Sequence, residues 1–232
     1  MVVGSDEYDE FLRRACAGSE LEWRKYRRRS ARKRVLDRVR ELGLEGLSEY
    51  LDRLRDDPAE AAALPDIMRV TVTRFFRERG RWDVLVEGIL PELLAKDPRP
   101  TFRAWSAGCC GGEEPYTLAL LWQERLKPRF PEVELEILAT DIDGASLDRA
   151  ARAVYERGSL REVPPGVVER WFLPVKGGFR LRPEAARLVT FRVHNLRTDP
   201  PPAAGVLDLA LCRYLAFTYY KGRRRLAAAE TL

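Results

Sequence analysis

The chain of 232 residues is 45% hydrophobic and 33% charged, a balance typical of a soluble globular protein with one or two domains. No apolar run approaches the ~18 residues of a membrane-spanning helix, and the acidic start MVVGSDEYDEF is unlike a signal peptide, so we expect no membrane insertion. Four scattered cysteines without a CxxC pair predict reduced thiols and a cytoplasmic protein, and a single histidine, His194, excludes a His-rich metal cluster.

The net charge of +5 comes from one short stretch. Residues 24–34, RKYRRRSARKR, hold eight Lys or Arg and no acid, while the rest of the chain has 33 basic against 36 acidic residues. A solvated helix face is the ordinary interpretation of a charge run, but this density also favours docking to an acidic protein or to a nucleic-acid backbone. Few aromatic residues accompany it, which gives little support to base stacking.

Residues 1–68 are predicted to form an all-helical domain, because no strand pattern occurs before residue 69. A charged helix is expected over residues 21–42, with Gly43 as its C-cap. An amphipathic helix follows, with Ser48 as its N-cap.

A third helix is predicted from Asp57, an N-cap acid followed by a proline at N1 and a glutamate at N3. Pro65 should kink or end this helix. Residues 68–80 begin with an extended Thr/Val alternation, and a further helix is expected over 81–95.

From residue 101 onward, strands and helices alternate. Strands are expected over 101–107, 133–140, 188–194 and 206–212, and helices over 113–126 and 144–155. This alternation predicts an α/β fold with a mostly parallel sheet in one domain, residues 69–232. Residues 156–187 do not fit a single crossover, and the Lys-Gly-Gly turn within 172–182 predicts an inserted β-hairpin.

The stretch 101–115, TFRAWSAGCCGGEEP, combines an apolar strand, a glycine-rich turn and the acidic first turn of a helix. Glycines at 108, 111 and 112 let the backbone turn sharply and let a ligand approach it closely. The next strand ends at Asp141, 29 residues past Gly112, where a carboxylate can accept hydrogen bonds from both hydroxyls of a ribose. The stretch therefore predicts a nucleoside-binding turn.

Charge selects among the nucleoside ligands. Glu113 and Glu114 would repel a pyrophosphate, and Cys110 stands where a dinucleotide-binding loop would have a glycine. S-adenosylmethionine carries a ribose, an ammonium and a sulfonium but no phosphate, so it suits two acids better than NAD or ATP does. The alternative is that both glutamates merely stabilise the helix terminus through its dipole.

A family resemblance covers most of the chain. WSAGCCGGEEPYTLAL (105–120) closely resembles the first motif of CheR-type chemotaxis receptor methyltransferases, which transfer methyl groups to receptor glutamates. TVTRFFRE (71–78), ATDID (139–143), HNL (194–196) and LCRYL (211–215) are similar to further motifs of that family in the same order. The resemblance implies a Rossmann-like methyltransferase sheet that uses S-adenosylmethionine and releases S-adenosylhomocysteine.

The resemblance also implies the roles of single residues. Glu114 would hold the methionyl end of the cofactor, Asp141 the ribose, and Asn195 with Leu196 the adenine side. Cofactor contacts are implied altogether for Thr71, Thr73, Arg77, Gly108, Glu113, Glu114, Asp141, Asn195, Leu196, Arg213 and Tyr214. Arg77, Arg213 and Tyr219 are the implied catalytic residues.

Methyl transfer to a glutamate needs no general base, because the carboxylate is already ionised at pH 7. The candidate site accordingly offers no paired acid and base. Our hypothesis is that Arg77 orients the substrate carboxylate through charge-assisted hydrogen bonds.

The sequence departs from the family pattern in several places. Tyr214 stands where the family has Asn, Thr71 replaces an Asn of the pre-motif, and Thr218 replaces a tyrosine that has Tyr219 one step away. The chain also stops about 20 residues after its fourth predicted strand, which would leave that strand as an exposed edge. We therefore expect a sheet truncated after the fourth strand. Either the chain is a fragment of a longer protein, which we favour, or another subunit covers the missing edge.

The sequence predicts methyl transfer to glutamates of a chemoreceptor or similar acidic helical protein, which docks on residues 24–34. Two alternatives stay open, a cofactor-binding or docking module that has lost activity and a nucleic-acid methyltransferase. The sequence leaves the receptor and the oligomeric state undetermined, and no metal is expected.

Overall fold

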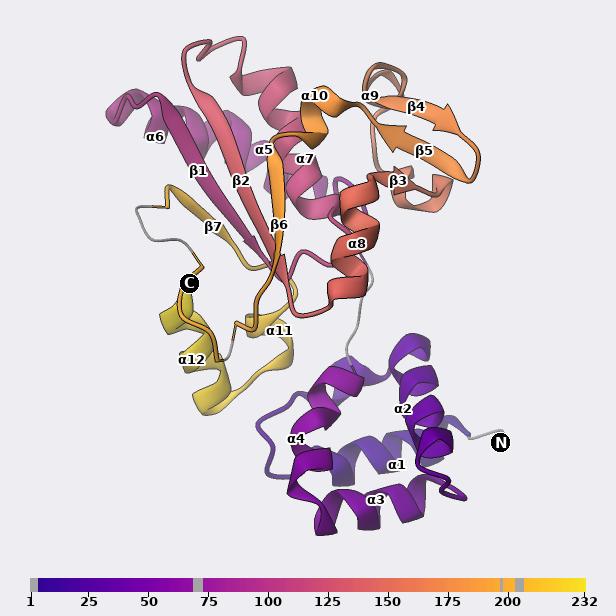
Figure 1. Cartoon of the computed structure of the whole chain (residues 1–232). Helices are drawn as coiled ribbons and strands as arrows, with labels where there is room; N and C mark the ends of the chain where they lie inside the picture. The colour runs from indigo at the N-terminus through magenta and orange to yellow at the C-terminus, as the bar shows by residue number, and fades with distance from the viewer. Residues whose placement is uncertain (1–3, 69–72, 197, 203–206) are drawn as a thin grey trace. The chain divides into compact units, whose positions relative to one another are not determined.

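The structure, a computed structural model, describes residues 4–68, 73–196, 198–202 and 207–232 (Figure 1). Its contacts divide the chain into two compact units. The helical unit comprises Met1–Thr71 and Tyr214–Glu230, and the α/β unit comprises essentially Val72–Arg213. Residues 214–230 are thus grouped with the helices, whereas the sequence prediction kept them with the sheet.

The helical unit is built from amphipathic helices whose apolar faces share one core. Its elements are α1 (Ser5–Ala15), the 3-10 turn η1 (Trp23–Tyr26), α2 (Arg29–Glu41), α3 (Leu47–Asp56), α4 (Pro58–Ile67), α11 (Ala216–Tyr219) and α12 (Gly222–Thr231). Phe11, Val35 and Tyr50 are buried in this core, and Tyr219 and Tyr220 pack against it. The predicted all-helical N-terminal domain is confirmed.

The basic helix α2 begins eight residues later than the sequence predicted, at Arg29. Leu21 forms an isolated antiparallel bridge with Tyr220, and Trp23–Tyr26 forms the separate 3-10 turn η1 where a continuous helix was expected. The predicted helix end is confirmed, because Gly43 has a φ of +69° and donates its N–H to the carbonyl of Arg40 at 3.0 Å.

The N-terminus of α3 corrects a second prediction. Its N-cap is Gly46 in extended conformation rather than Ser48. The carboxylate of Glu49 accepts a hydrogen bond from the N–H of Glu45 at 2.9 Å. A glutamate in the first turn therefore binds back to the preceding backbone, as in a capping box.

The start of α4 is as predicted. Asp57 Oδ1 accepts hydrogen bonds from the N–H groups of Ala59 and Glu60, at 2.9 and 3.2 Å. Pro65, however, does not end the helix, which runs on to Ile67. The proline removes one N–H donor toward the preceding turn, but the last turn still closes, since Met68 donates its N–H to the carbonyl of Leu64 at 2.9 Å.

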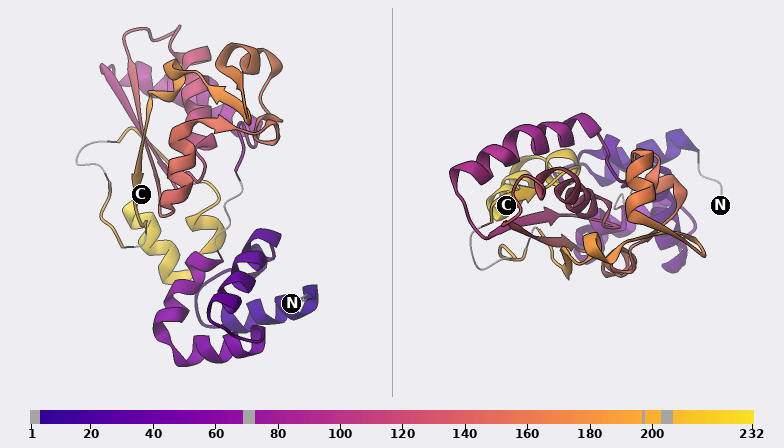
Figure 2. Two further views of the ribbon diagram at one scale, coloured as in Figure 1. Left: turned by 45° about the vertical axis from the view of Figure 1, so that its right-hand side comes forward. Right: turned by 90° about the horizontal axis from the view of Figure 1, so that it is seen from above.

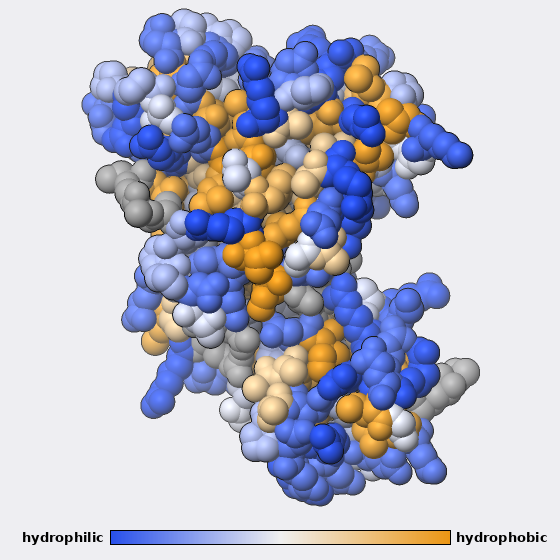
Figure 3. Space-filling view, in the orientation of Figure 1, coloured by the Kyte–Doolittle hydropathy of each residue, from blue (hydrophilic) through white to orange (hydrophobic). Residues whose placement is uncertain are grey.

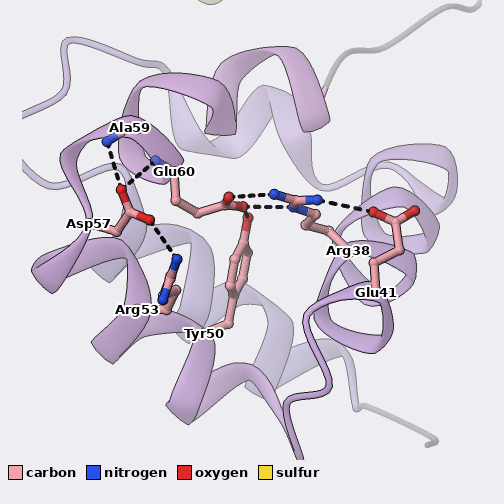
Figure 4. Close-up of polar contacts among 7 residues, drawn as sticks. All are labelled: Arg38, Glu41, Tyr50, Arg53, Asp57, Ala59 and Glu60. Carbon is pink, nitrogen blue, oxygen red and sulfur yellow. Dashed lines mark hydrogen bonds and ion pairs between the residues drawn. The ribbon is translucent and has the colours of Figure 1, made fainter.

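A buried carboxylate joins three helices of this unit (Figure 4). Glu60 is 5% exposed and accepts hydrogen bonds from Arg38 Nη2 at 2.7 Å, Arg38 Nε at 3.0 Å and the Tyr50 hydroxyl at 2.7 Å. Arg38, whose side chain is 34% exposed, also pairs with the exposed Glu41 at 3.3 Å. Hydrogen bonding to Arg38 lowers the pKa of Glu60, so the buried carboxylate remains ionised.

The α/β unit is centred on a four-stranded parallel sheet of order β6-β2-β1-β7 (Figure 1). The strands are β1 (Thr101–Ala107), β2 (Glu134–Asp141), β6 (Val189–Val193) and β7 (Leu209–Leu211). Each strand begins and ends within three residues of its predicted bounds. The predicted parallel sheet is confirmed. In the described residues, β7 stands at one edge of this order.

The helical elements of this unit share one apolar core with the strands. They are α5 (Arg79–Val84), the π-helical η2 (Leu85–Ile89), α6 (Leu90–Lys96), α7 (Glu113–Leu121), the π-helical η3 (Trp122–Leu126), α8 (Gly144–Arg152), the 3-10 turn η4 (Arg157–Leu160), α9 (Pro165–Trp171) and α10 (Pro183–Ala186). α7 is buried on nearly every side, which agrees with its continuous apolar sequence. It contacts β2 and β6 of the main sheet.

A small antiparallel sheet, drawn apart from the main sheet in Figure 2, follows α8. Its strands are β3 (Val154–Tyr155), β4 (Phe172–Val175) and β5 (Gly178–Leu181), in the order β3-β5-β4. The predicted hairpin is confirmed. The helix expected over 144–155 is shorter, because Ala153 adopts a φ of +50° and the chain then enters β3.

The surface of the two units differs in character. Figure 3 shows apolar side chains gathered over the main sheet, and a surface of the helical unit that is hydrophilic apart from separate apolar spots. Among the described residues, no helix has the length and apolar content needed to cross a membrane.

Candidate functional site

The carboxyl ends of β1 and β2 lie side by side, and the glycine-rich turn 108–112 leads from β1 into α7 (Figure 1). Gly108 and Cys109 both donate their N–H groups to the carbonyl of Thr140 near the end of β2, at 2.7 and 2.9 Å. The turn is thus fixed to the neighbouring strand at the edge where open parallel sheets bind their ligands.

Gly112 occupies a position that no other residue would fill without strain. Its φ is +86°, and a Cβ there would lie 2.9 Å from the Ala150 side chain and 3.1 Å from the Tyr155 hydroxyl. The same hydroxyl donates to the carbonyl of Gly111 at 2.7 Å. A residue of the small antiparallel sheet therefore stabilises the glycine-rich turn by a hydrogen bond.

Asp141 orders the turn directly. Its side chain is buried, with Oδ2 accepting from the N–H of Cys110 at 2.8 Å and Oδ1 from the N–H of Asp143 at 2.9 Å. A carboxylate has about four acceptor positions, so each oxygen retains capacity for a ligand hydroxyl. The carboxylate predicted to hold a ribose is also a structural part of the loop.

Glu114 lies under the turn at the start of α7. Ser106 donates its hydroxyl to Glu114 Oε1 at 2.9 Å, and Arg213 Nη1 is 3.8 Å from Glu114 Oε2. Burial raises the pKa of Glu114 to about 7, although Arg213, Ser106 and Arg77 act to lower it. This carboxyl is therefore close to half ionised at neutral pH and would be stabilised in its charged form by a cationic ligand.

Glu113 is also buried, at 5% exposure. Ser159 donates to its Oε1 at 3.3 Å, while its Oε2 has no hydrogen-bond partner in the described part of the chain. Burial raises the pKa of Glu113 as well. A buried carboxylate oxygen without a donor is an energetic cost that a ligand or water can remove.

Arg77 sits in a strained turn over residues 75–78. The residues on either side, Phe76 and Glu78, have positive φ values of 55° and 59°, which bulky side chains adopt only when the surroundings hold them. The surroundings do so here, because Phe76 N–H donates to the hydroxyl of Thr117 in α7 at 3.1 Å. Strain of this kind is typical of functional turns.

Arg213 links the end of the β7 segment to this turn. Its Nη2 donates to the carbonyl of Arg77 at 2.8 Å and lies 3.6 Å from Glu78 Oε2. Its guanidinium also stacks over the Trp82 ring, 4.8 Å from the centroid. Two arginines predicted to act together, Arg77 and Arg213, are thus joined directly in the structure.

The segment after β6 follows the carboxyl end of that strand, next to the end of β2. Asn195 donates its N–H to Asp199 Oδ2 at 2.8 Å, and Leu196 is buried. His194 packs its ring edge-on against Trp105 and contacts the carbonyl of Pro200 through Nε2 at 2.9 Å. His194 also donates its N–H to the carbonyl of Asp141 at 3.0 Å, so the backbone of the HNL motif is held at more than one point and two of its side chains are buried.

The other predicted residues lie elsewhere or outside the described residues. Thr73 is half-buried in the α/β unit, and Thr71 lies outside the described residues. Tyr214 and Tyr219 are grouped with the helical unit, where the Tyr219 ring packs 5.3 Å from that of Tyr26. Their predicted roles in the site remain predictions.

Several residues of this site were not predicted from the sequence. Ser106, Tyr155 and Ser159 contact the glutamates or the turn. Tyr155 and Ser159 are separated from their partners by 44 and 46 residues, and no motif marks them. Ser106 could have been suspected, because it is a polar residue in the otherwise apolar second half of β1.

The residues present fit a cationic nucleoside ligand. The turn has a backbone that a ligand can approach, and Asp141 has spare acceptor positions. Two carboxyls lie at the helix start, the partly buried Glu114 and the buried Glu113, which has an oxygen lacking a donor among the described residues. A phosphate would meet these carboxyls with repulsion. Among the described residues, no group of His, Cys, Asp or Glu side chains could hold a metal ion.

Comparison with known proteins agrees with this chemistry. The profile "CheR methyltransferase, SAM binding domain" matches residues 71–230, and "CheR methyltransferase, all-alpha domain" matches residues 6–68. The chemotaxis protein methyltransferase of Listeria innocua is 31% identical over 188 residues, which are 81% of this chain and 69% of that protein. The probable chemotaxis protein methyltransferase of Rhizobium etli is 35% identical, over 78% of this chain and 69% of its own length.

A third relative is a larger protein, only part of which is similar to this chain. An uncharacterised 104.1 kDa protein of Rhodobacter capsulatus is 32% identical over 84% of this chain, which spans 20% of that relative. Matches of this extent define the class of protein, a methyltransferase whose cofactor is S-adenosylmethionine. Within that class, the chain belongs to the CheR methyltransferase family.

Proposed function

We propose that this methyltransferase acts on glutamate side chains of a chemoreceptor or a similar acidic helical protein, and that its product is a glutamate methyl ester. One observation carries the proposal. Arg77 is displayed on a strained turn and joined to Arg213, close to the buried carboxyls where the cofactor is expected. Two guanidinium groups at such a place suit a substrate carboxylate.

The residues divide into two groups by role. Glu113, Glu114 and Asp141 would bind the cofactor, which supplies an activated methyl group when bound. Arg77 would bind the substrate carboxylate, and Arg213 would position Arg77 through its carbonyl while offering a second positive charge. Because the nucleophile is already ionised at pH 7, positioning and exclusion of water are the main tasks of the site, and proximity alone supplies roughly 7–11 kcal/mol in ideal cases.

The basic stretch 24–34 supports the proposed substrate. It spans η1 and the first half of α2, and most of its cationic side chains are exposed. Acidic helices of a receptor would be attracted to such a surface. A cytoplasmic location belongs to the same proposal, since the cofactor and the proposed receptor segments meet there.

The test is incubation of the chain with methyl-labelled S-adenosylmethionine and purified receptor fragments rich in glutamate. The proposal predicts label in protein that alkali releases as methanol. Label that resists alkali, or that enters added RNA or DNA instead, would assign the activity to another acceptor. Normal cofactor binding without any transfer would identify a docking module.

A further inference from the structure

The helical unit contains a cavity of about 530 Å³ between α1 and the start of α2. Six of the ten residues that line it are Arg or Lys. This volume lies within the range of ordinary small-molecule sites, roughly 300–1,000 Å³. The cavity is therefore both large enough for a compact ligand and strongly cationic.

The positive charge of this cavity is poorly compensated. Asp9 is the one acid among its lining residues, and Arg27 already binds it with distances of 2.8 and 2.7 Å. Arg28, Arg29 and Lys33 form no ion pair within the described residues, and all three are exposed. The cavity thus holds more cations than its own acids can neutralise.

The end of α2 adds to this positive potential. The helix begins at Arg29, its N-cap residue Arg28 makes no capping side-chain hydrogen bond, and its first turn has no acid. A helix N-terminus favours negative charge, because its first N–H groups have no intrahelical partner. Here cations occupy the positions where acids are normally found, which leaves both the dipole and the side chains available to an anion.

A buried hydroxyl of the same cavity also has no hydrogen-bond partner. Tyr8 lines the cavity and is 3% exposed, and its hydroxyl has no partner among the described residues. The guanidinium of Arg32 lies 5.9 Å from the centre of the Tyr8 ring. Burial raises the pKa of Tyr8, so the hydroxyl keeps its proton and can donate it to an acceptor oxygen.

We propose that this cavity binds a phosphorylated small molecule. A phosphate group offers several acceptor oxygens and more than one negative charge, which matches forked arginines, a lysine, an uncapped helix start and a hydroxyl donor. An acidic helix of a receptor would instead lie across the exposed face of the stretch 24–34 and would not need a concave site lined by a buried tyrosine. The proposal stands independently of methyl transfer, although both involve residues 27–33.

The test is calorimetric titration of the full chain with inorganic pyrophosphate at constant ionic strength, without receptor or cofactor. The expected result is saturable binding that Lys33→Gln and Arg28→Gln each weaken by about fivefold to tenfold. Lys25→Gln is the matched control, because Lys25 is an exposed lysine of the same basic stretch that does not line the cavity. That control should change affinity by less than about twofold, because it removes only long-range charge.

Tyr8→Phe distinguishes a specific binding site from long-range electrostatic attraction. It leaves the net charge unchanged, and affinity should fall by about threefold or more, the usual size of one lost hydrogen bond. Its thermal unfolding should remain that of the wild type, since the hydroxyl has no partner to lose. Absence of saturable binding, equal effects of Lys25→Gln and Lys33→Gln, or full affinity in a folded Tyr8→Phe would each overturn the proposal.

Discussion

Glu113 and Glu114 are two acids at one helix N-terminus, where the dipole stabilises negative charge by about 0.3–1 kcal/mol, and up to ~2 kcal/mol when partly buried. Burial acts in the opposite direction. The rise in the pKa of Glu114 from 4.5 to about 7 corresponds to roughly 3 kcal/mol, so burial outweighs the dipole and the two arginines together. Glu114 is therefore poised to lose its proton when a cation arrives.

A pH dependence of cofactor binding follows. A bound cation lowers the pKa of Glu114 from about 7, so binding releases protons near neutral pH. Affinity should fall by up to about tenfold per unit as the pH drops below 7. Calorimetry in buffers of different ionisation enthalpy measures both effects. Glu114→Gln should weaken binding by roughly tenfold or more and abolish the pH dependence, and a variant that kept it would contradict this assignment.

Arg77 is assigned to the substrate rather than to the cofactor. Arg77→Ala should therefore lower methyl transfer by at least about 100-fold while leaving the cofactor dissociation constant within a few-fold. Arg81→Ala is a suitable control, because Arg81 is an exposed arginine whose ion pair with Glu78 lies on the surface. Near-normal turnover of Arg77→Ala would show that another group holds the substrate.

Gly112 provides a test of the turn geometry. Gly112→Ala should destabilise the α/β unit by about 1–3 kcal/mol, because its φ is +86° and the new Cβ would meet the Ala150 and Tyr155 side chains. Gly88→Ala, on an exposed helical surface with nothing within 4 Å, should be neutral or stabilising by up to about 1 kcal/mol. Urea unfolding measures both, and equal effects would refute the packing argument.

At the scale of elements, prediction succeeded where the pattern was local. β1 and the helical run 113–126 were predicted to the residue, because an apolar strand, a glycine turn and an apolar helix follow each other without interruption. The start of α2 was missed because Leu21 bridges to Tyr220, nearly the whole chain away. The helix propensity of the local residues carries no information about a contact between residues so far apart in the sequence.

The same distinction applies to the candidate site. The glycines, the two glutamates and Asp141 lie in motifs with recognisable spacing. The structure brings them together at the carboxyl ends of β1 and β2. Tyr155 and Ser159 reach the turn only through the inserted sheet and η4, so their role depends on tertiary packing. The grouping of residues 214–230 with the helical unit also depends on tertiary packing, which local sequence patterns do not predict.

The helical unit depends on its buried carboxylate. Glu60→Ala should lower the free energy of unfolding by about 2–4 kcal/mol, because it leaves the Tyr50 hydroxyl and part of the Arg38 guanidinium without an acceptor. Glu41→Ala removes another partner of the same arginine, but Glu41 is 63% exposed, and its loss should cost at most about 0.5 kcal/mol. Similar losses for the two variants, measured by chemical denaturation, would contradict the importance of burial.

At the scale of the whole molecule, the basic stretch and the candidate methyl-transfer site lie in different compact units. The stretch 24–34 holds eight basic residues and lies in the helical unit, whereas the glycine turn, Asp141 and the two arginines of the candidate site lie in the α/β unit. If the basic stretch docks an acidic substrate, the apparent substrate affinity should weaken steeply with salt while cofactor affinity changes little.

The most direct test of the account is to locate the transferred methyl group. Receptor fragments with intact glutamates, and matched fragments with those glutamates replaced by alanine, are incubated with the chain and the cofactor and then examined by peptide mass spectrometry. The account predicts the mass of a methyl group on glutamate side chains of the intact fragment, lost on alkaline treatment, and none on the substituted fragment. Methylation that persists on the substituted fragment, or its absence from both fragments while the cofactor binds normally, would contradict it.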